Sequence, residues 1–344
     1  MQFDVESVFC PASFAKEIRS IEIAIVIQAA IIPQHFNQIN RTMPTIAIVA
    51  PSGYAPEPAN VARAIERLQA RGWAVKNFVN HAHKFQRFAA DDASRLAQLY
   101  QAADDSEVDV ILAMRGGYGI SRILADIDFE RLAASGKLFV GFSDFTPIHL
   151  GLLAKTATIS FAGPMVCEDL GTEECHEASF QGLKECLIPA PNSLPYTLNI
   201  PSLGNPAVNV SGTFWGGNLA MVAHLVGSEF IPLIEGGILF LEDVNEMPNR
   251  VERMLLQLHH AGILKRQKAI VLGQFTNYRL SDYENGYDFN AMLDFIRSKI
   301  SIPIITGLPF GHVANKVTLP VGAQVSLVSD AEQFTLQFGS YPHL

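Results

Sequence analysis

The chain has 344 residues, of which 49% are hydrophobic, which is enough for a large core and favours two domains over one. Charged residues make up 17%, the net charge is −9, and no polybasic run occurs, so binding to nucleic acid or to an anionic membrane is not expected. The cysteines show neither CxxC spacing nor histidines at metal-ligand spacing, which predicts reduced, mostly buried thiols and no metal site: Cys10, Cys167, Cys175 and Cys186.

The first 42 residues carry an apolar run, residues 21–32, that is too short to span a bilayer, which needs about 20 residues. Lys16 and Arg19 before it resemble the charged start of a signal peptide, but acidic residues flank the run and no small-x-small cleavage site follows. We predict that residues 1–42 are an extension outside the fold and that Met43 is the working start. A weak secretion signal is the alternative.

From Thr45 onwards, patterns typical of strands and helices alternate. Continuous apolar runs predict buried strands, and helical spacing of apolar residues predicts helices between them. The predicted strands are 45–50, 73–79, 108–114 and 137–142, and the helices are 60–71, 91–103 and the segment after Ser143. Such repeats predict a parallel sheet with helices on both faces, in an N-terminal α/β domain over residues 43–188. Ligands collect at the carboxyl ends of parallel strands, where "RGGYG" (115–119) and Ser143 both lie.

A segment rich in Pro, Asn and Ser predicts a linker over residues 189–210. The remainder, 211–344, is predicted to form a C-terminal mixed α/β domain with several short β-strands. Its expected elements are a strand, glycine turn and helix over 212–227, strands 236–243 and 268–275, helices 248–262 and 289–300, and short strands from Lys316 to about Phe338.

Ser143 follows an apolar strand and precedes the helix "TPIHLGLLAK", so its hydroxyl should stand at the tip of the strand. A serine nucleophile needs a base, an acid that orients the base, and donors for the oxyanion. The match to the G-x-S-x-G elbow is partial because Phe145 replaces the last glycine. These residues alone favour a helix cap shared with Asp144 and Thr146.

His312 is the histidine that stands in a loop before a strand, where catalytic residues concentrate, although a lone loop histidine is more often only surface. Glu242 ends the apolar strand "GILFL", where a charge is costly unless it is paired. Asp243 and Glu246 are rivals for the role of orienting acid. The alternative is a solvated strand end with Glu246 and Arg250 as an i, i+4 pair.

Two glycine-rich stretches follow predicted strands. "RGGYG" lacks the features of a P-loop or a dinucleotide fingerprint, and it suits a backbone that comes close to a substrate and offers N–H groups. "WGGN" (215–218) has the same character. Either stretch could instead be only a tight turn.

Six blocks occur in the order typical of the LD-carboxypeptidases, and from about Pro44 the chain resembles this family of serine peptidases. The blocks are "APSGY", "RGGYGISRILADIDFE", "GFSDFTPIHLGLLA", "GTFWGGNLAMVAHLVG", "LEDVNEMPNRVERMLLQLHHAGIL" and "GHVANKVTLPVGA". The resemblance implies a triad of Ser143, Glu242 and His312. It implies oxyanion donors in the backbone N–H groups of Asp144 and Gly117, and no metal or organic cofactor.

The resemblance is closest to the murein-recycling branch of the family. It implies hydrolysis of the L,D-peptide bond that releases terminal D-alanine from murein tetrapeptides, during peptidoglycan recycling in the cytoplasm. Arg115 is a candidate contact for the free C-terminal carboxylate, with bracing of the Gly-Gly turn as its rival role. The expected partner is a small peptide, with no nucleic acid and no membrane, and homodimer formation stays open.

Two alternative functions are retained. One is a hydrolase of the microcin self-immunity type, which cuts peptidyl nucleotide conjugates. The other is a non-catalytic module whose two α/β domains clamp a ligand.

A chain shortened to begin at Met43 is expected to melt at the same temperature as the full chain and to keep its activity. The reason is that "TIAIVA" is a complete first strand that needs no lead-in. Thermal melting of the two chains side by side is the measurement, and a large drop for the shortened chain would show that the extension belongs to the fold.

Overall fold

The computed structural model describes residues 43–81, 83–190, 193 and 195–344. The predictions made for residues 1–42 therefore lie outside the described residues. All residues from 43 onwards belong to one compact unit, Asn40–Leu344. Within the described ranges, no helix is both long enough and apolar enough to cross a membrane.

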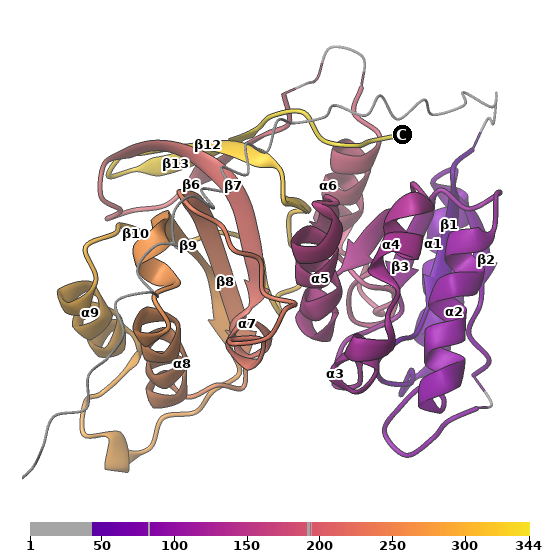
Figure 1. Cartoon of the computed structure of the whole chain (residues 1–344), viewed down its shortest axis with the longest axis horizontal. Helices are drawn as coiled ribbons and strands as arrows, with labels where there is room; N and C mark the ends of the chain where they lie inside the picture. The colour runs from indigo at the N-terminus through magenta and orange to yellow at the C-terminus, as the bar shows by residue number, and fades with distance from the viewer. Residues whose placement is uncertain (1–42, 82, 191–192, 194) are drawn as a thin grey trace, which may run out of the picture. The chain divides into compact units, whose positions relative to one another are not determined.

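The first sheet has six strands in the order β11-β5-β4-β3-β1-β2. Figure 1 shows β1, β2 and β3 of this sheet close together. Its strands are β1 (Thr45–Val49), β2 (Ala74–Asn77), β3 (Val110–Ala113), β4 (Leu138–Gly141), β5 (Ser160–Ala162) and β11 (Leu319–Val321). The first five are mutually parallel, and β11 is antiparallel to β5. Every residue of β1, β3 and β4 is buried, as expected for continuous apolar strands that are covered on both faces.

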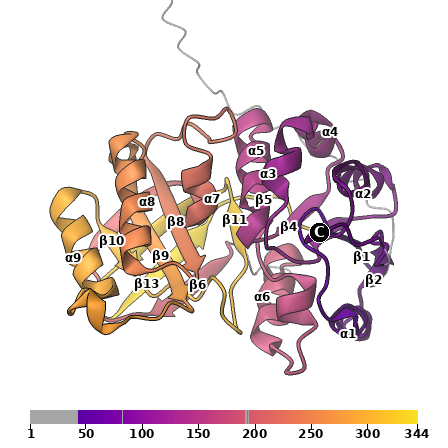
Figure 2. The ribbon, with the colours of Figure 1, turned by 90° about the horizontal axis from the view of Figure 1, so that it is seen from below.

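Helices cover both faces of this sheet. Viewed from below, α1 (Pro58–Ala70) and α6 (Glu177–Leu187) lie on one side, while α2 (Asp92–Asp104), α4 (Phe129–Ala134) and α5 (Thr146–Thr156) lie on the other (Figure 2). Asp91 begins α2 as predicted, because its carboxylate accepts the Ser94 N–H at 2.8 Å. The predicted parallel sheet with helices on both faces is confirmed.

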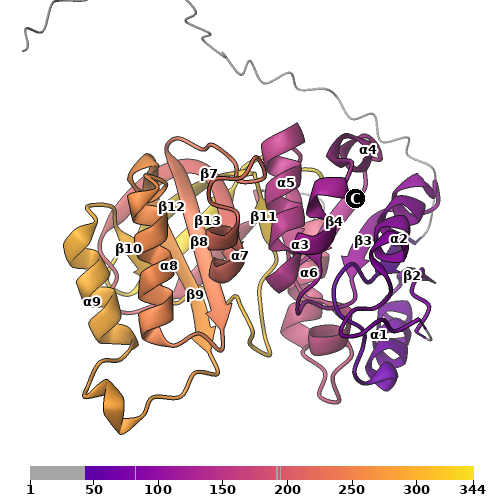
Figure 3. The same ribbon diagram turned by 60° about the horizontal axis from the view of Figure 1, so that its bottom comes forward.

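The second sheet has seven strands in the order β10-β9-β8-β7-β12-β13-β6. Its strands are β6 (Thr197–Pro201), β7 (Val208–Asn218), β8 (Gly237–Val244), β9 (Gln267–Thr276), β10 (Ile304–Thr306), β12 (Gln324–Ser329) and β13 (Gln333–Phe338). Strands β7 to β10 are parallel, and the remaining pairings are antiparallel. Helices α7 (Leu219–His224), α8 (Pro248–His260) and α9 (Phe289–Lys299) lie in front of it (Figure 3). The predicted mixed α/β character is confirmed.

The remaining helical segments are short. They are α3 (Ile120–Ile123), the 3₁₀ turns η1 (Leu124–Asp126), η2 (Ser143–Phe145), η4 (Leu264–Arg266) and η5 (Asp282–Glu284), and the π-helical turn η3 (Val166–Leu170). Two of them, η2 and η3, lie at the carboxyl edge of the first sheet and contribute to the site described below.

Two segments differ from the expected division of the chain. Residues 189–210, predicted as a linker, contain β6 and the start of β7. Their Pro and Asn content concealed the alternation by which Ile200 turns into the core, opposite Phe334 of β13. Strand β11 comes from the predicted second domain yet completes the first sheet. Such long-range pairings leave no local signal in a sequence.

The predicted glycine turn over 212–227 is wrong, because strand β7 continues through the glycine pair to Asn218. Gly216 and Gly217 have φ values of +134° and +141°, a conformation that residues with a Cβ rarely adopt. A Cβ on Gly216 would lie 2.0 Å from the Phe240 carbonyl oxygen, and one on Gly217 would lie 2.6 Å from Thr146 Oγ1. The two glycines therefore let β7 pack directly on β8 and on the first turn of α5.

The described cysteines are all free thiols. Cys167 and Cys186 are buried, whereas Cys175 is exposed. Burial raises the pKa of the Cys167 thiol to about 12, so this cysteine stays protonated at neutral pH.

Gly151→Ala is expected to destabilise the protein by about 1–3 kcal/mol through overpacking. A Cβ at this position in α5 would lie 2.3 Å from the Phe129 ring, which is itself in the core. Gly182→Ala in α6 is the matched control, since its Cβ would meet nothing closer than 3.6 Å. It should stabilise by about 0.5–1 kcal/mol through helix propensity. Denaturant unfolding of both variants checks this, and equal signs would contradict it.

Candidate active site

Ser143 occupies the sharp turn between β4 and α5. Its φ is +59°, in the left-handed region that is uncommon for a residue other than glycine. The turn is crowded on one side, because a Cβ on Gly116 would lie 2.9 Å from Ser143 Oγ. Strained, tightly packed turns of this kind hold a nucleophile at the tip of a strand. The hydroxyl makes no capping bond to α5, whose first turn lacks a side-chain cap.

His312, in the loop that follows β10 of the second sheet, contacts this serine. Its Nε2 lies 3.1 Å from Ser143 Oγ, and its Nδ1 lies 2.9 Å from Glu242 Oε2. The imidazole is 22% exposed, whereas the Glu242 carboxylate is fully buried. Phe142 packs beside the imidazole with ring centroids 4.9 Å apart. The structure thus brings the three predicted side chains into one hydrogen-bonded series.

Gly311 is required for the histidine loop to reach this position. Its φ is +132°, and a Cβ there would lie 3.0 Å from the Gln274 carbonyl oxygen and 3.1 Å from Glu242 Oε2. Glycine therefore allows the loop to lie against β9 and against the buried carboxylate.

The three acids near the end of β8 have different partners. Glu242 contacts His312, and its Oε1 accepts from Asn218 Nδ2 at 3.2 Å. Asp243 Oδ1 accepts from the same Nδ2 at 2.9 Å, and its Oδ2 accepts from the Ala220 N–H at 2.8 Å, at the start of α7. A register irregularity in the β8–β9 pairing falls between Leu241 and Asp243, at the position of Glu242. Although the two carboxylates have separate main partners, both reach Asn218.

Glu246, the remaining rival, pairs with Arg250 as the i, i+4 interpretation predicted. Arg250 Nη2 donates to Glu246 Oε1 at 3.1 Å. Glu246 lies just before α8 rather than within it, and its contacts direct it away from the series.

Electrostatics set the protonation of the two histidines near the serine. Burial by itself lowers the pKa of His312, but the hydrogen bond and charge of Glu242 outweigh burial and the nearby Lys316, so the net pKa is raised. His149 differs, because burial lowers its pKa to about 4. Its ring nitrogens contact Ser160 Oγ and the Gly141 carbonyl, so it is a neutral packing group.

The two residues whose N–H groups were predicted to bind the oxyanion differ in how they lie against Ser143. Asp144 follows it directly, and its buried carboxylate accepts from Ser52 Oγ at 2.7 Å and from the Ile120 N–H at 3.1 Å. These bonds tie the turn after β1 and the start of α3, which directly follows "RGGYG", to the nucleophile turn. Gly117 is exposed with a φ of +106°, and it is Gly116 that packs against Ser143. The roles of the Asp144 and Gly117 N–H groups therefore stay predictions.

A buried ion pair behind His312 was not predicted. Lys316 Nζ contacts Asp169 Oδ1, and both side chains are almost fully buried. The ammonium also lies 4.5 Å above the Phe142 ring, which packs on His312. The pair joins the loop that carries His312 to η3. Its only sequence signal is a lysine within the apolar stretch "HVANKVTLPV".

Arg115 has fixed partners next to the nucleophile turn. Its Nε lies 2.9 Å from Glu168 Oε1, and its Nη1 donates to the Tyr54 carbonyl oxygen at 3.0 Å. The bond to Tyr54 fits the predicted bracing role, and the partly exposed ion pair keeps the guanidinium accessible to a ligand. Glu168 was not singled out in the sequence.

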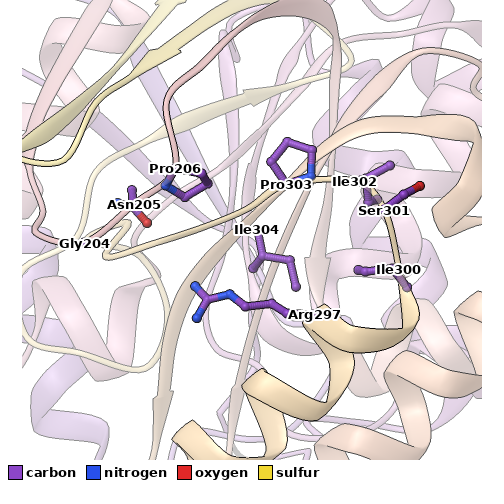
Figure 4. Close-up of a pocket in the computed structure, with 9 residues that line it drawn as sticks. All are labelled: Gly204, Asn205, Pro206, Arg297, Ile300, Ser301, Ile302, Pro303 and Ile304. Carbon is purple, nitrogen blue, oxygen red and sulfur yellow. The ribbon is translucent and has the colours of Figure 1, made fainter.

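A separate hollow of about 540 Å³ lies on the second sheet's side of the molecule and includes no residue of the series (Figure 4). It is lined by Gly204, Asn205, Pro206, Arg297 and residues 300–304. The Asn205 side chain is already bonded to the Thr306 backbone. Nucleophilic groups are lacking among these residues, apart from an ordinary serine.

Comparison with known proteins gives a consistent result. Residues 46–163 match the LD-carboxypeptidase N-terminal domain, and residues 211–327 match the LD-carboxypeptidase C-terminal domain. A murein tetrapeptide carboxypeptidase of Pseudomonas aeruginosa is 29% identical over 249 residues, which covers 70% of this chain and 78% of that protein.

Solved structures resemble the chain as well. The crystal structure of muramoyltetrapeptide carboxypeptidase from Oxalobacter formigenes is 49% identical, with a TM-score of 0.81, and covers 87% of this chain and 99% of the other. The microcin C7 self-immunity protein MccF is 20% identical, with a TM-score of 0.79 and coverages of 88% and 98%. At that identity the second likeness supports the fold alone.

The acid limb of the pH profile of kcat/KM is expected above pH 6.5. A base must be neutral to accept a proton, and the raised pKa keeps His312 protonated to higher pH. Glu242→Gln removes the contribution that raises this pKa, so the limb should move to lower pH while kcat falls about 10³- to 10⁴-fold. Measuring kcat/KM against pH on a tetrapeptide substrate checks both effects.

Asp243→Asn and Glu246→Gln are the controls for this experiment. Asp243 raises the pKa of His312 only through its charge at a distance, so its variant should shift the limb less. Glu246 is paired with Arg250 and should matter least. If Glu246→Gln were the most impaired of the three, the acid would be misassigned.

Proposed function

The chain belongs to the LD-carboxypeptidase family of serine peptidases, and from this premise we propose that it releases the terminal D-alanine of murein tetrapeptides by hydrolysing an L,D-peptide bond. The observation that carries the proposal is the series from Glu242 through His312 to Ser143, with distances of 2.9 and 3.1 Å. The named activities of the relatives from Pseudomonas and Oxalobacter support the choice of substrate.

In the proposed first step, Ser143 Oγ attacks the carbonyl carbon that precedes D-alanine. His312 Nε2 accepts the hydroxyl proton, and the Glu242 carboxylate orients the imidazole and stabilises its cation. The backbone N–H groups of Asp144 and Gly117 are assigned to the oxyanion, where each donor would contribute about 3 kcal/mol. The left-handed turn at Ser143 and the contact of its hydroxyl with His312 support the role of Ser143 as the nucleophile.

In the proposed second step, the imidazolium returns its proton to the leaving amine of D-alanine. Water, activated by the same imidazole, then hydrolyses the ester on Ser143 and restores the free hydroxyl. Arg115 is proposed to contact a carboxylate of the substrate. Each of these steps uses side chains of this chain alone.

We place the reaction in peptidoglycan recycling in the cytoplasm, on the basis of the resemblance to the murein branch. The proposal holds for a monomer and for a homodimer alike, because all three residues of the series come from one chain.

The two alternatives have weaker support. A hydrolase of peptidyl nucleotide conjugates rests on MccF, whose likeness is confined to the fold. A non-catalytic binding module would have no need of a histidine held between a serine and a buried carboxylate. Labelling by a serine-reactive fluorophosphonate separates an enzyme from a binder.

Ser143→Ala is expected to reduce D-alanine release from purified murein tetrapeptide by about 10⁴-fold or more, because the nucleophile is lost. Chromatography of the released D-alanine is the measurement. The matched control is Ser298→Ala, an exposed serine on α9 that bonds only to its own helix. Both variants should melt like the unaltered chain. Turnover near normal in Ser143→Ala would rule out the assigned nucleophile.

A further inference from the structure

Arg115 and Glu168 form an ion pair beside the nucleophile, with Nε and Oε1 2.9 Å apart. Arg115 immediately precedes Gly116, which packs against Ser143. The two side chains are 25% and 41% exposed. Both charges are therefore accessible to a ligand, unlike those of the buried pair Lys316–Asp169, and Glu168 lies near enough to His312 for their charges to interact.

Backbone contacts hold both partners in place. The Tyr54 carbonyl fixes the Arg115 guanidinium, through a bond of 3.0 Å to Nη1. Glu168 lies in the π-helical turn η3, which is tied to the end of β3 by the Cys167 N–H bond to the Met114 carbonyl at 2.9 Å. π-Helical turns occur frequently at functional sites. In this one, Asp169 turns toward Lys316, while Glu168 turns toward Arg115.

The chemistry of the pair restricts what it can bind. A lone carboxylate that approaches Arg115 is repelled by Glu168, and a lone ammonium that approaches Glu168 is repelled by Arg115. A group that carries both charges satisfies both at once, each meeting its opposite. The pair is therefore complementary to a zwitterion.

The substrate of the proposed function has one group of this kind. The amine of the terminal D-alanine is consumed in the scissile bond, so that residue offers only a carboxylate. Diaminopimelate, the residue that precedes it, ends its side chain in an ammonium and a carboxylate on the same carbon. Lysine at the same position would offer only the ammonium.

We propose that Arg115 and Glu168 form the recognition site for the zwitterionic end of the diaminopimelate side chain. The guanidinium binds the distal carboxylate, and the Glu168 carboxylate binds the distal ammonium. The inference rests on the proposed function and extends it to the choice between diaminopimelate and lysine. It also assigns Arg115 to the distal carboxylate rather than to the C-terminal one.

The test uses four synthetic tetrapeptides. The first contains meso-diaminopimelate, the second has its distal carboxylate amidated, the third contains lysine, and the fourth has the D-alanine carboxylate amidated instead. Release of D-alanine or D-alaninamide gives kcat/KM for the unaltered chain, Arg115→Gln, Glu168→Gln and the double variant. Arg131→Gln is the matched control, because it breaks a surface ion pair with Asp104, between α4 and α2.

For the unaltered chain, distal amidation or lysine should lower kcat/KM about 10- to 100-fold, the effect of one charge-assisted contact. Arg115→Gln should lower kcat/KM for the diaminopimelate peptide by the same factor. It should lower kcat/KM for the distally amidated peptide by less than about threefold, so that the variant no longer discriminates against amidation. Glu168→Gln should lower kcat/KM for all four peptides by about tenfold, since every one of them keeps the side-chain ammonium. Arg131→Gln should leave the ratios of kcat/KM between the four peptides unchanged.

Three results would overturn the site. The unaltered chain could show no preference between the first two peptides. Arg115→Gln could lower kcat/KM for all four peptides by one common factor, although two of them lack the distal carboxylate. The decrease in kcat/KM caused by Arg115→Gln could be absent for the D-alaninamide peptide, which would assign Arg115 to the C-terminal carboxylate. Failure of the unaltered chain to cleave any peptide would instead overturn the proposed function, and this site with it.

Discussion

The close approach of strand β7 to the first turn of helix α5 is the contact on which the rest of the site depends. The Asn218 N–H donates to Thr146 Oγ1 at 3.1 Å, and Gly217 leaves room for the threonine side chain. Ser143 follows β4 of the first sheet and Glu242 lies on β8 of the second. His312 contacts both from the loop that connects β10 of the second sheet to β11 of the first. A bulkier residue at Gly217 would separate the sheets where a histidine must lie within hydrogen-bond distance of a serine.

Charge burial gives this junction its rigidity. The carboxylates of Glu242 and Asp243 share Asn218, Asp144 holds the start of α3, and Asp169 holds Lys316. Each would be costly to bury without its partner, so each partner has a narrow range of positions. Because of the same burial, the pKa of His312 depends on the neighbouring charges more than on solvent.

Prediction from the sequence was successful where the signal is local. The strands before Ser143 and Glu242 are continuous apolar runs, and polar residues that follow such runs stand at strand ends. On local grounds Ser143 was favoured as a helix cap. His312 was singled out by its loop before a strand, but only the six family blocks favoured a catalytic role over a surface position. The ion pairs of Glu168 and Lys316 were not predicted, since an isolated charged residue in an apolar stretch of sequence does not indicate which residue it pairs with. Strand β6 was missed, and β11 was expected among the short C-terminal strands but not in the first sheet, because the pairing partners of both strands lie far along the chain.

The crossing of β11 into the first sheet bears on how the chain folds during synthesis. The outer edge of strand β5 pairs with β11, which is synthesised after five of the seven strands of the second sheet. Until then the nascent first sheet presents an unpaired, apolar edge of the kind that recruits foreign strands. Vectorial synthesis therefore favours chaperone binding to the nascent N-terminal half. The N-terminal half is also a poor candidate for exchange as an independent module between proteins, because the first sheet is incomplete without β11 from the C-terminal half.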